Sequence, residues 1–156
     1  TLHADLPEFI RKIRALGYLV KLDTNGTNPE MLSGLIREKL INYVAMDLKA
    51  PFDKYEATVG VKVDCNNLEK SVKIIKSSGL PYEFRTTVLP DLLRPEDFEA
   101  MGRIISGAAK WYLQKFKSDT DLVDSGYRAK KAYTNKEMSE LADIGRKYAD
   151  LCEVRG

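Results

Sequence analysis

Two short stretches of this sequence carry polar side chains directly after an apolar run. The first reads Tyr-Leu-Val-Lys-Leu-Asp-Thr-Asn-Gly and brings a carboxylate, a hydroxyl and an amide to Asp23, Thr24 and Asn25. The second reads Tyr-Val-Ala-Met-Asp-Leu-Lys and carries Asp47 and Lys49, which are two positions apart and so point to the same side of a strand. Acids, a base and a hydroxyl at the carboxyl ends of neighbouring parallel strands predict a small-molecule site.

Two later strands add polar groups to the same predicted edge, namely Arg85 and Gln114. A ligand ammonium would be held by Asp23. A ribose diol would need a carboxylate that accepts two hydroxyl hydrogens, such as Asp47. A ligand carboxylate would need a cation, which Lys49 or Arg85 supplies. The set therefore suits a zwitterionic or polyhydroxylated ligand.

Each of these groups also has a purely structural interpretation. Asp-Thr-Asn-Gly is a good turn by itself, since Asn-Gly tolerates positive φ. Asp47 and Lys49 could form a structural ion pair. Arg85 could lie on the surface, and Gln114 could have a structural role. The occurrence of polar groups at four successive strand ends favours a binding site over four unrelated structural roles.

Apolar residues recur at helical and strand intervals in strict alternation. The expected helices span 6–16, 29–40, 67–78, 95–105 and 135–148, and the expected strands 18–22, 43–48, 82–89, 111–116 and 151–155. This alternation favours an α/β fold with parallel strands, either a barrel or an open sheet. Because such units normally begin with a strand, a chain that begins with a helix is expected to lack at least one preceding strand.

Helix starts are expected at residues that cap free backbone N–H groups. Asp5 and Thr134 each stand three positions before a glutamate, Asn28 precedes a proline, and Asn66 or Asn67 is expected to cap the third helix.

Two long connections, 50–65 and 117–133, follow predicted strands, and loops of this length are usually functional or mobile. Gly34 lies within a predicted helix, which indicates close packing.

The composition limits the classes of function. A length of 156 residues fits a single domain, 1–156. A net charge of +2 argues against a nucleic-acid partner. Cys65, Cys152 and a single His3 lack metal-ligand spacing, so no metal site is expected. No apolar run approaches the roughly 18 residues of a membrane span, and no signal peptide is visible. A cytoplasmic protein with reduced cysteines and no membrane contact is expected.

The strand-end motifs resemble those of a known enzyme family. Leu-Asp-Thr-Asn-Gly, Met-Asp-Leu-Lys and Phe-Arg-Thr-Thr-Val-Leu-Pro look like successive strands of the radical S-adenosylmethionine enzymes that activate glycyl radical enzymes. Ala-Pro-Phe-Asp-Lys-Tyr, Trp-Tyr-Leu-Gln-Lys-Phe and the closing Val-Arg-Gly are most similar to the anaerobic ribonucleoside-triphosphate reductase activating proteins. The resemblance runs the length of the chain and implies a partial barrel of the TIM type, truncated at its N-terminal strands.

The resemblance also implies roles for individual residues. Asp23 would meet the methionine ammonium of S-adenosylmethionine and Thr24 its carboxylate, with Asn25 beside them. Asp47 would bind the ribose hydroxyls and Lys49 the carboxylate. Arg85 would lie against the same ligand and is the one residue for which a catalytic role is expected. Gln114 is expected to replace a histidine found at the sixth strand end in pyruvate formate-lyase activating enzymes, where this chain has Phe116.

One departure from the family is large. This chain has neither the Cys-x-x-x-Cys-x-x-Cys loop that binds a [4Fe-4S] cluster nor the Gly-Gly-Glu-Pro motif. It is therefore expected to be the C-terminal part of an anaerobic oxidoreductase and to be inactive alone. The parent would hold the cluster and generate a glycyl radical on a partner reductase or lyase. The alternatives are a standalone module that binds a nucleoside or amino acid without redox chemistry, and a partial barrel without function.

A truncated barrel would leave the strand 18–22 without a neighbour on one side. An open edge of this kind can pair with another chain. A homodimer formed through that edge is therefore expected.

Overall fold

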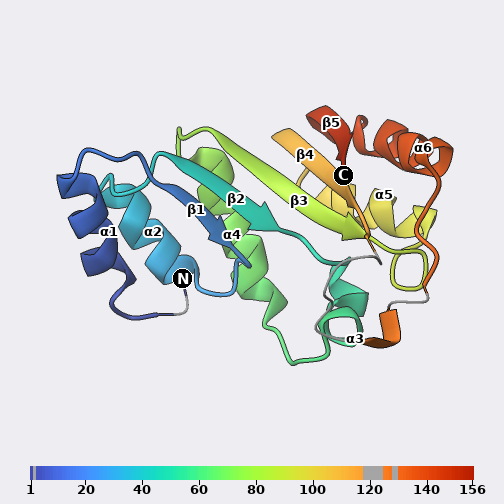
Figure 1. Cartoon of the computed structure of the whole chain (residues 1–156), viewed down its shortest axis with the longest axis horizontal. Helices are drawn as coiled ribbons and strands as arrows, with labels where there is room; N and C mark the ends of the chain where they lie inside the picture. The colour runs from blue at the N-terminus through green and yellow to red at the C-terminus, as the bar shows by residue number, and fades with distance from the viewer. Residues whose placement is uncertain (2, 118–124, 128–129) are drawn as a thin grey trace.

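The computed structural model describes residues 1, 3–117, 125–127 and 130–156, and within these ranges it contains one sheet of five parallel strands. The strands lie side by side in chain order (Figure 1). They are β1 Lys21–Thr24, β2 Tyr43–Asp47, β3 Tyr82–Val88, β4 Ala108–Lys115 and β5 Ala149–Arg155. All five carboxyl ends therefore lie at one edge of the sheet, as predicted.

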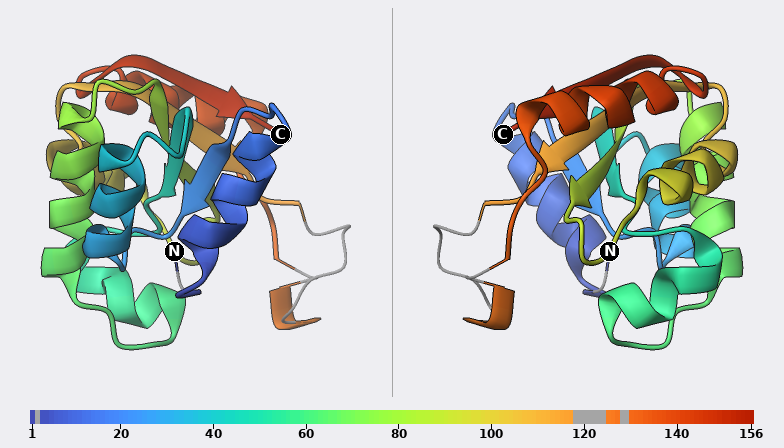
Figure 2. Two further views of the ribbon diagram at one scale, coloured as in Figure 1. Left: turned by 90° about the vertical axis from the view of Figure 1, so that its left-hand side faces the viewer. Right: turned by 90° about the vertical axis from the view of Figure 1, so that its right-hand side faces the viewer.

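The helices that connect the strands cover one side of the sheet, whereas the first helix precedes β1 and lies beyond it at the edge (Figures 1 and 2). The described helices are α1 Leu6–Ala15, α2 Pro29–Arg37, α3 Tyr55–Val59, α4 Cys65–Ser77, α5 Pro95–Ile104 and α6 Asn135–Gly145, with 3-10 turns η1 Phe52–Lys54 and η2 Ser125–Tyr127. Sequential strand order with helices on one side is the arrangement of a partial barrel, and not of a doubly wound sheet. The predicted α/β fold class is confirmed.

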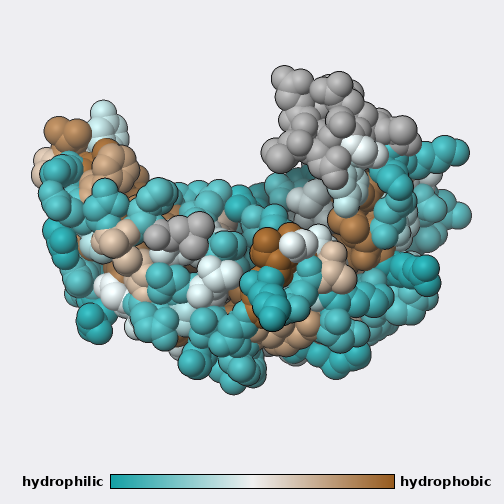
Figure 3. Space-filling view, turned by 90° about the horizontal axis from the view of Figure 1, so that it is seen from below, coloured by the Kyte–Doolittle hydropathy of each residue, from teal (hydrophilic) through white to brown (hydrophobic). Residues whose placement is uncertain are grey.

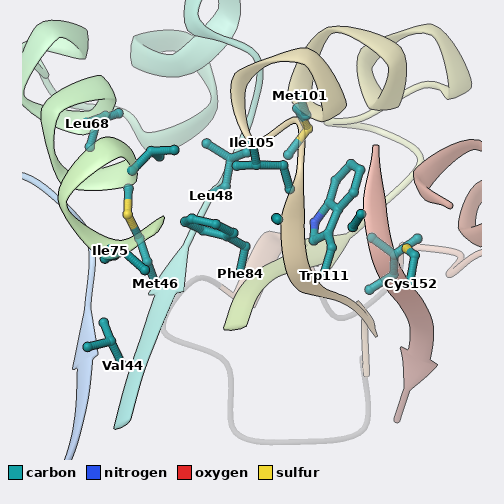
Figure 4. Packing of buried hydrophobic residues seen from close by; sticks show 14 of the residues in the cluster. Val44, Met46, Leu48, Leu68, Ile75, Phe84, Met101, Ile105, Trp111 and Cys152 are labelled. Atoms are coloured by element: carbon teal, nitrogen blue, oxygen red, sulfur yellow. The ribbon is translucent and has the colours of Figure 1, made fainter. Parts of the chain in front are cut away.

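The covered face of the sheet is apolar because alternate strand residues point toward the helices. Met46, Phe84 and Trp111 lie on three neighbouring strands and are fully buried beneath α4 and α5 (Figure 4). The indole of Trp111 stacks on Phe98 at 6.0 Å between ring centroids. Its Nε1 donates to Thr86 Oγ1 at 3.0 Å, so the one polar atom of the indole is satisfied inside the core.

The opposite face of the sheet carries the remaining strand residues, and these are largely polar. Strand register places Asp47 beside Arg85, and Thr87 beside Gln114. Parallel sheets are normally covered on both faces. A barrel interior explains why this face is polar and uncovered by helices, and the strand ends on it form the candidate site described below.

The first predicted strand was wrong in position. We expected it at 18–22, whereas β1 spans Lys21–Thr24. The ladder begins where Lys21 pairs with Tyr43, the first residue of β2, so earlier residues have no strand partner. Val20 is held instead by Asn42, whose side chain accepts from the Val20 N–H at 2.9 Å. In the same way β4 and β5 begin earlier than predicted, because their first residues, Ala108 and Ala149, pair with each other.

Several helix expectations also need correction. Asn28 and Thr134 cap their helices as predicted, but the Asp5 side chain makes no capping bond. Asp64, and not Asn66 or Asn67, caps α4 by accepting from the Asn66 N–H at 2.9 Å.

The connection 50–65 contains η1 and α3, so it is partly helical. Much of the other long connection, 117–133, lies outside the described residues.

Large apolar side chains reach the surface near α1 and the residues that follow it. Phe9, Leu16 and Leu19 are 58%, 72% and 79% exposed. Hydrophobic side chains gather at this end of the molecule, on the left in Figure 3. The patch lies on the α1 and β1 side, where the sheet ends.

Two helical glycines have opposite packing environments, and this generates a stability prediction. A Cβ at Gly102 in α5 would collide with the Tyr148 ring, whereas a Cβ at Gly34 in α2 would meet nothing within 4 Å. The close packing expected at Gly34 was therefore wrong. We predict that Gly102→Ala lowers the free energy of unfolding by about 1–3 kcal/mol through overpacking. Gly34→Ala should raise it by about 0.5–1 kcal/mol through helix propensity.

Urea unfolding monitored by circular dichroism measures both variants under the same conditions. A stabilised Gly102→Ala variant would contradict the packing of α5 against Tyr148.

Candidate functional site

Five of the predicted site residues line a single hollow at the carboxyl edge of the sheet. The hollow has a volume of about 230 Å³ and is lined by Thr1, Asp23, Thr24, Asn25, Asp47 and Arg85. Its residues come from the ends of β1 and β2, from the turn after β1, and from the middle of β3. Thr1 joins them from the start of the chain. The structure thus brings Asp23 and Arg85, which are 62 positions apart in the sequence, into direct contact.

Arg85 holds the two carboxylates of the hollow together. Its Nε and Nη2 each lie 2.9 Å from Asp47 Oδ1, and its Nη1 lies 3.0 Å from Asp23 Oδ2. The Arg85 side chain is only 15% exposed, Asp47 is 25% exposed and Asp23 is 54% exposed. The guanidinium is therefore fixed on its buried side by Asp47, and its contact with Asp23 is the one open to solvent.

Lys49 completes the charge pairing at the end of β2. Its Nζ lies 2.9 Å from Asp47 Oδ2, so the two Asp47 oxygens face different cations. Lys49 also lines a second, mostly apolar hollow of about 430 Å³, whose other residues are Thr58, Val59, Thr87, Leu89, Leu92, Phe116 and Tyr127. Lys49 thus connects the two hollows, because it pairs with Asp47 of the charged hollow and lines the apolar one.

The pairing determines the charge states of the site. Partial burial acts to raise the pKa of Asp23, but hydrogen bonds from Lys21 and Arg85 outweigh it and hold that pKa below the usual 3.8. Burial acts to lower the pKa of Arg85, but the charge of Asp47 and the hydrogen bond to Asp23 raise it overall. Both residues are therefore ionised at neutral pH. The stability contributed by the Asp23 contacts is present above pH 3.8 and is lost as the pH falls below it.

Thr24 and Asn25 also stabilise the turn that follows β1. Thr24 Oγ1 accepts from the Gly26 N–H at 3.1 Å, and Asn25 Oδ1 accepts from the Thr27 N–H at 3.1 Å. The structural interpretation of Asp-Thr-Asn-Gly is therefore correct for these two side chains. The interpretation as a site is not excluded by it, because both residues line the hollow as well.

Two of the seven predicted site residues do not line this hollow: Lys49, which reaches it only through its ion pair with Asp47, and Gln114, which lies apart from it. Gln114 lines a separate hollow of about 460 Å³ with Thr87, Lys115, Phe116, Lys117, Arg155 and Gly156. Phe116, at the expected histidine position, packs its ring edge to face with Tyr127.

A second layer of polar residues lies below the hollow on the same face, and the sequence reasoning missed it. Glu83 is only 3% exposed, and around it lie Tyr43, Lys21 and Arg155. The sequence could have indicated it, because side chains alternate between the two faces of a strand and Glu83 therefore shares a face with Arg85.

The described residues offer no place for a metal cluster. They contain no group of three or more His, Cys, Asp or Glu side chains that could hold a metal ion. Burial raises the pKa of the Cys152 thiol to about 12 and also raises that of Cys65, so neither is a ready thiolate ligand. The described residues therefore do not fit a [4Fe-4S] cluster. Among the described helices, none has the length and apolar character that crossing a bilayer requires.

Comparisons with known proteins agree with the resemblance seen in the sequence. No family model matches the chain. A protein of Methanocaldococcus jannaschii, provisionally named as a glycyl-radical enzyme activating enzyme, is 34% identical over 152 residues, which are 95% of this chain. The chain spans 63% of the length of that relative. The resemblance to enzymes that activate glycyl radical enzymes is thereby confirmed.

A solved structure shows the same fold. The crystal structure of a domain of pyruvate-formate lyase-activating enzyme from Bacteroides vulgatus superimposes with a TM-score of 0.73 at 13% identity. The superposition covers 97% of this chain and 89% of that one.

The bridging position of Arg85 leads to a prediction. Arg85→Gln removes the cation between two acids, one of which is largely buried, and should lower the free energy of unfolding by about 1–2 kcal/mol at pH 7. Lys73→Gln is the matched control, because Lys73 pairs with Glu69 at 2.7 Å on an exposed helix surface and should change stability by less than about 0.5 kcal/mol. Denaturant unfolding measures both variants, and equal effects would contradict a central role for Arg85.

Proposed function

Starting from this likeness to an activating enzyme over nearly its whole length, we propose that the chain is the S-adenosylmethionine-binding part of a radical S-adenosylmethionine activating enzyme. The observation that carries the proposal is the hollow in which Asp23, Asp47 and Arg85 converge from three parallel strands. Its residues offer the acceptors and cations that an amino acid joined to a ribose requires.

Asp23 suits the ammonium of the ligand. Its carboxylate is ionised and 54% exposed, so an ammonium can approach from solvent while Arg85 keeps its contact with Asp47. Thr24 supplies a hydroxyl beside it for the ligand carboxylate, and Asn25 lies at the outer wall. These groups would fix the amino-acid end of the ligand at the end of β1.

Asp47 suits the ribose diol. Its Oδ1 already faces two Arg85 nitrogens and its Oδ2 faces Lys49 Nζ. A carboxylate has about four acceptor positions, so one hydroxyl hydrogen can be accepted directly and a second once Lys49 turns to the ligand carboxylate. Lys49 Nζ would neutralise the ligand carboxylate. Arg85 would contact the bound ligand directly, which is the basis of the catalytic role that we assign to it. Gln114 would contribute only if the ligand extends toward β4.

S-adenosylmethionine, when bound to a [4Fe-4S] cluster, supplies the radical chemistry of this enzyme class. The residues described here fit S-adenosylmethionine and do not fit the cluster. We therefore assign the cluster to residues outside this sequence in the parent enzyme, and we assign to this chain the binding and orientation of the ligand. Free Cys65 and Cys152 agree with a cytoplasmic, reducing location.

The partner of the parent enzyme would be a glycyl radical enzyme, either an anaerobic ribonucleotide reductase or a lyase of the pyruvate formate-lyase type. The sequence motifs favour the reductase. The connection 50–65 lies beside the apolar hollow through Thr58 and Val59, so it is suitably placed to contact a partner.

A standalone binding module is the second candidate. It is favoured by the fact that this chain alone brings five of the seven predicted residues to one hollow. Such a module would bind a nucleoside or an amino acid as well as it binds S-adenosylmethionine, whereas the activating-enzyme proposal requires both halves of the ligand for full affinity.

Ligand binding tests the proposal directly. The chain should bind S-adenosylmethionine in isothermal titration calorimetry more tightly than it binds adenosine or methionine. Asp47→Asn should weaken the binding about tenfold or more, because hydrogen bonds to a charged acceptor contribute roughly 1.5–3 kcal/mol. Glu69→Gln, on the outer surface of α4, should bind like the wild type. No wild-type binding at millimolar ligand would contradict the proposal.

We also propose that the chain forms a homodimer through the open edge of β1. Among the described strands, β1 pairs with β2 alone, and the exposed Phe9, Leu16 and Leu19 lie on the same side of the molecule. Sedimentation equilibrium should show a monomer–dimer equilibrium, and Leu19→Lys should shift it toward monomer. A monomer throughout, at high protein concentration, would contradict the dimer.

A further inference from the structure

Glu83 is an almost completely buried acid on the polar face of the sheet. It lies on β3 two positions before Arg85, so the two side chains share that face. Glu83 is 3% exposed, and a buried carboxylate is unfavourable unless it is paired and hydrogen-bonded. Tyr43 OH donates to Glu83 Oε2 at 2.9 Å, and Arg155 Nη1 lies 3.3 Å from both carboxylate oxygens. Lys21 Nζ lies 3.8 Å from Oε1.

The partners of Glu83 are themselves held in place. The Arg155 guanidinium lies 3.2 Å from the centroid of the Tyr112 ring, on the strand between β3 and β5. Burial and the hydrogen bond to Glu83 raise the pKa of Tyr43 to about 12, so its hydroxyl remains a donor throughout the physiological range. Glu83 therefore has two fixed partners, and Lys21 is its adjustable third.

Lys21 connects this layer to the ligand hollow. Its ammonium lies 3.8 Å from Glu83 and 3.2 Å from Asp23 Oδ1, and its side chain is 48% exposed. A continuous line of alternating charges results, which runs through Arg155, Glu83, Lys21, Asp23, Arg85, Asp47 and Lys49. Asp23 thus lies between two cations, Lys21 and Arg85, and it is the acid that the proposed ligand ammonium needs.

We propose that Glu83 is a positioning residue for the hollow, which shares Lys21 with Asp23 and so keeps the Asp23 carboxylate available to a cationic group of the ligand. If Glu83 were neutral, Asp23 would be the remaining carboxylate partner of Lys21. The ammonium would then pair fully with Asp23 and would also repel a ligand cation. This inference rests on the proposed function only in that Asp23 receives the ligand ammonium.

The test is the titration of Asp23 itself, followed by carbon-13 NMR of its side-chain carboxyl. Glu83→Gln removes the charge and preserves the shape, and Tyr43 can still donate to the amide oxygen. The Asp23 pKa should fall further below 3.8 in this variant, because Lys21 is no longer shared. Adding Lys21→Met should reverse the fall. Glu69→Gln, which removes an exposed acid on α4, should leave Asp23 unchanged.

A second variant covers the case in which Glu83→Gln does not fold. Arg155 is 46% exposed, and Arg155→Gln leaves Glu83 with Lys21 as its remaining cation. Lys21 should then move toward Glu83, and the Asp23 pKa should rise. Lys115→Gln is the matched control, since Lys115 donates to Asn135 at the start of α6 and takes no part in the line of charges.

Measuring ligand binding as well separates a failure of the positioning role from a failure of the proposed function. Glu83→Gln should weaken S-adenosylmethionine binding about threefold to tenfold, with recovery when Lys21→Met is added. An Asp23 pKa that is unchanged or raised in Glu83→Gln overturns the positioning role, even if the wild type binds the ligand. A pKa that responds as expected in a chain that binds no S-adenosylmethionine supports the positioning role and contradicts the proposed function.

Discussion

The candidate site depends on a single guanidinium. Arg85 lies on β3, and the two acids that it bonds lie on β1 and β2, so its side chain connects three adjacent strands across the polar face. Asp23 and Asp47 would repel each other in a partly buried hollow if this cation were absent. The two neighbouring lysines complete the pairing, because Lys49 contacts the Asp47 oxygen that Arg85 does not, and Lys21 contacts the other Asp23 oxygen.

The sheet explains why such a line of charges exists. Helices cover one face of the five strands, and the core there is apolar and close-packed around Phe84 and Trp111. None of the described connecting helices covers the other face, so its residues must be compatible with water and with one another. Alternating charges satisfy that requirement, and even the buried Glu83 is paired and hydrogen-bonded. A face built in this way can exchange one of its internal partners for a charged ligand group with little other rearrangement.

A structural role and the proposed binding role fall on the same residues at the end of β1. Thr24 and Asn25 cap the turn through their own side-chain oxygens, yet they also form the wall of the hollow. The turn holds these side chains in fixed positions before any ligand arrives, which reduces the entropy lost on binding. The two interpretations that the sequence left open are therefore compatible.

Much of this protein could be predicted from the sequence by itself. Its period-two and helical patterns determined the order of elements, the parallel sheet, and which residues of β3 face the core, because burial acts on each element locally. The strand-end rule then placed Asp23, Asp47 and Arg85 at one edge. Strand boundaries failed at Tyr18 and Leu19, since a strand begins only where a neighbour offers hydrogen bonds. The tertiary structure alone decided that Arg85 bridges two acids, that Gln114 lies apart from them, and that Glu83 and Arg155 belong to the same line of charges. These pairings join residues as much as 72 positions apart, and no local pattern in a sequence specifies which distant charges will meet.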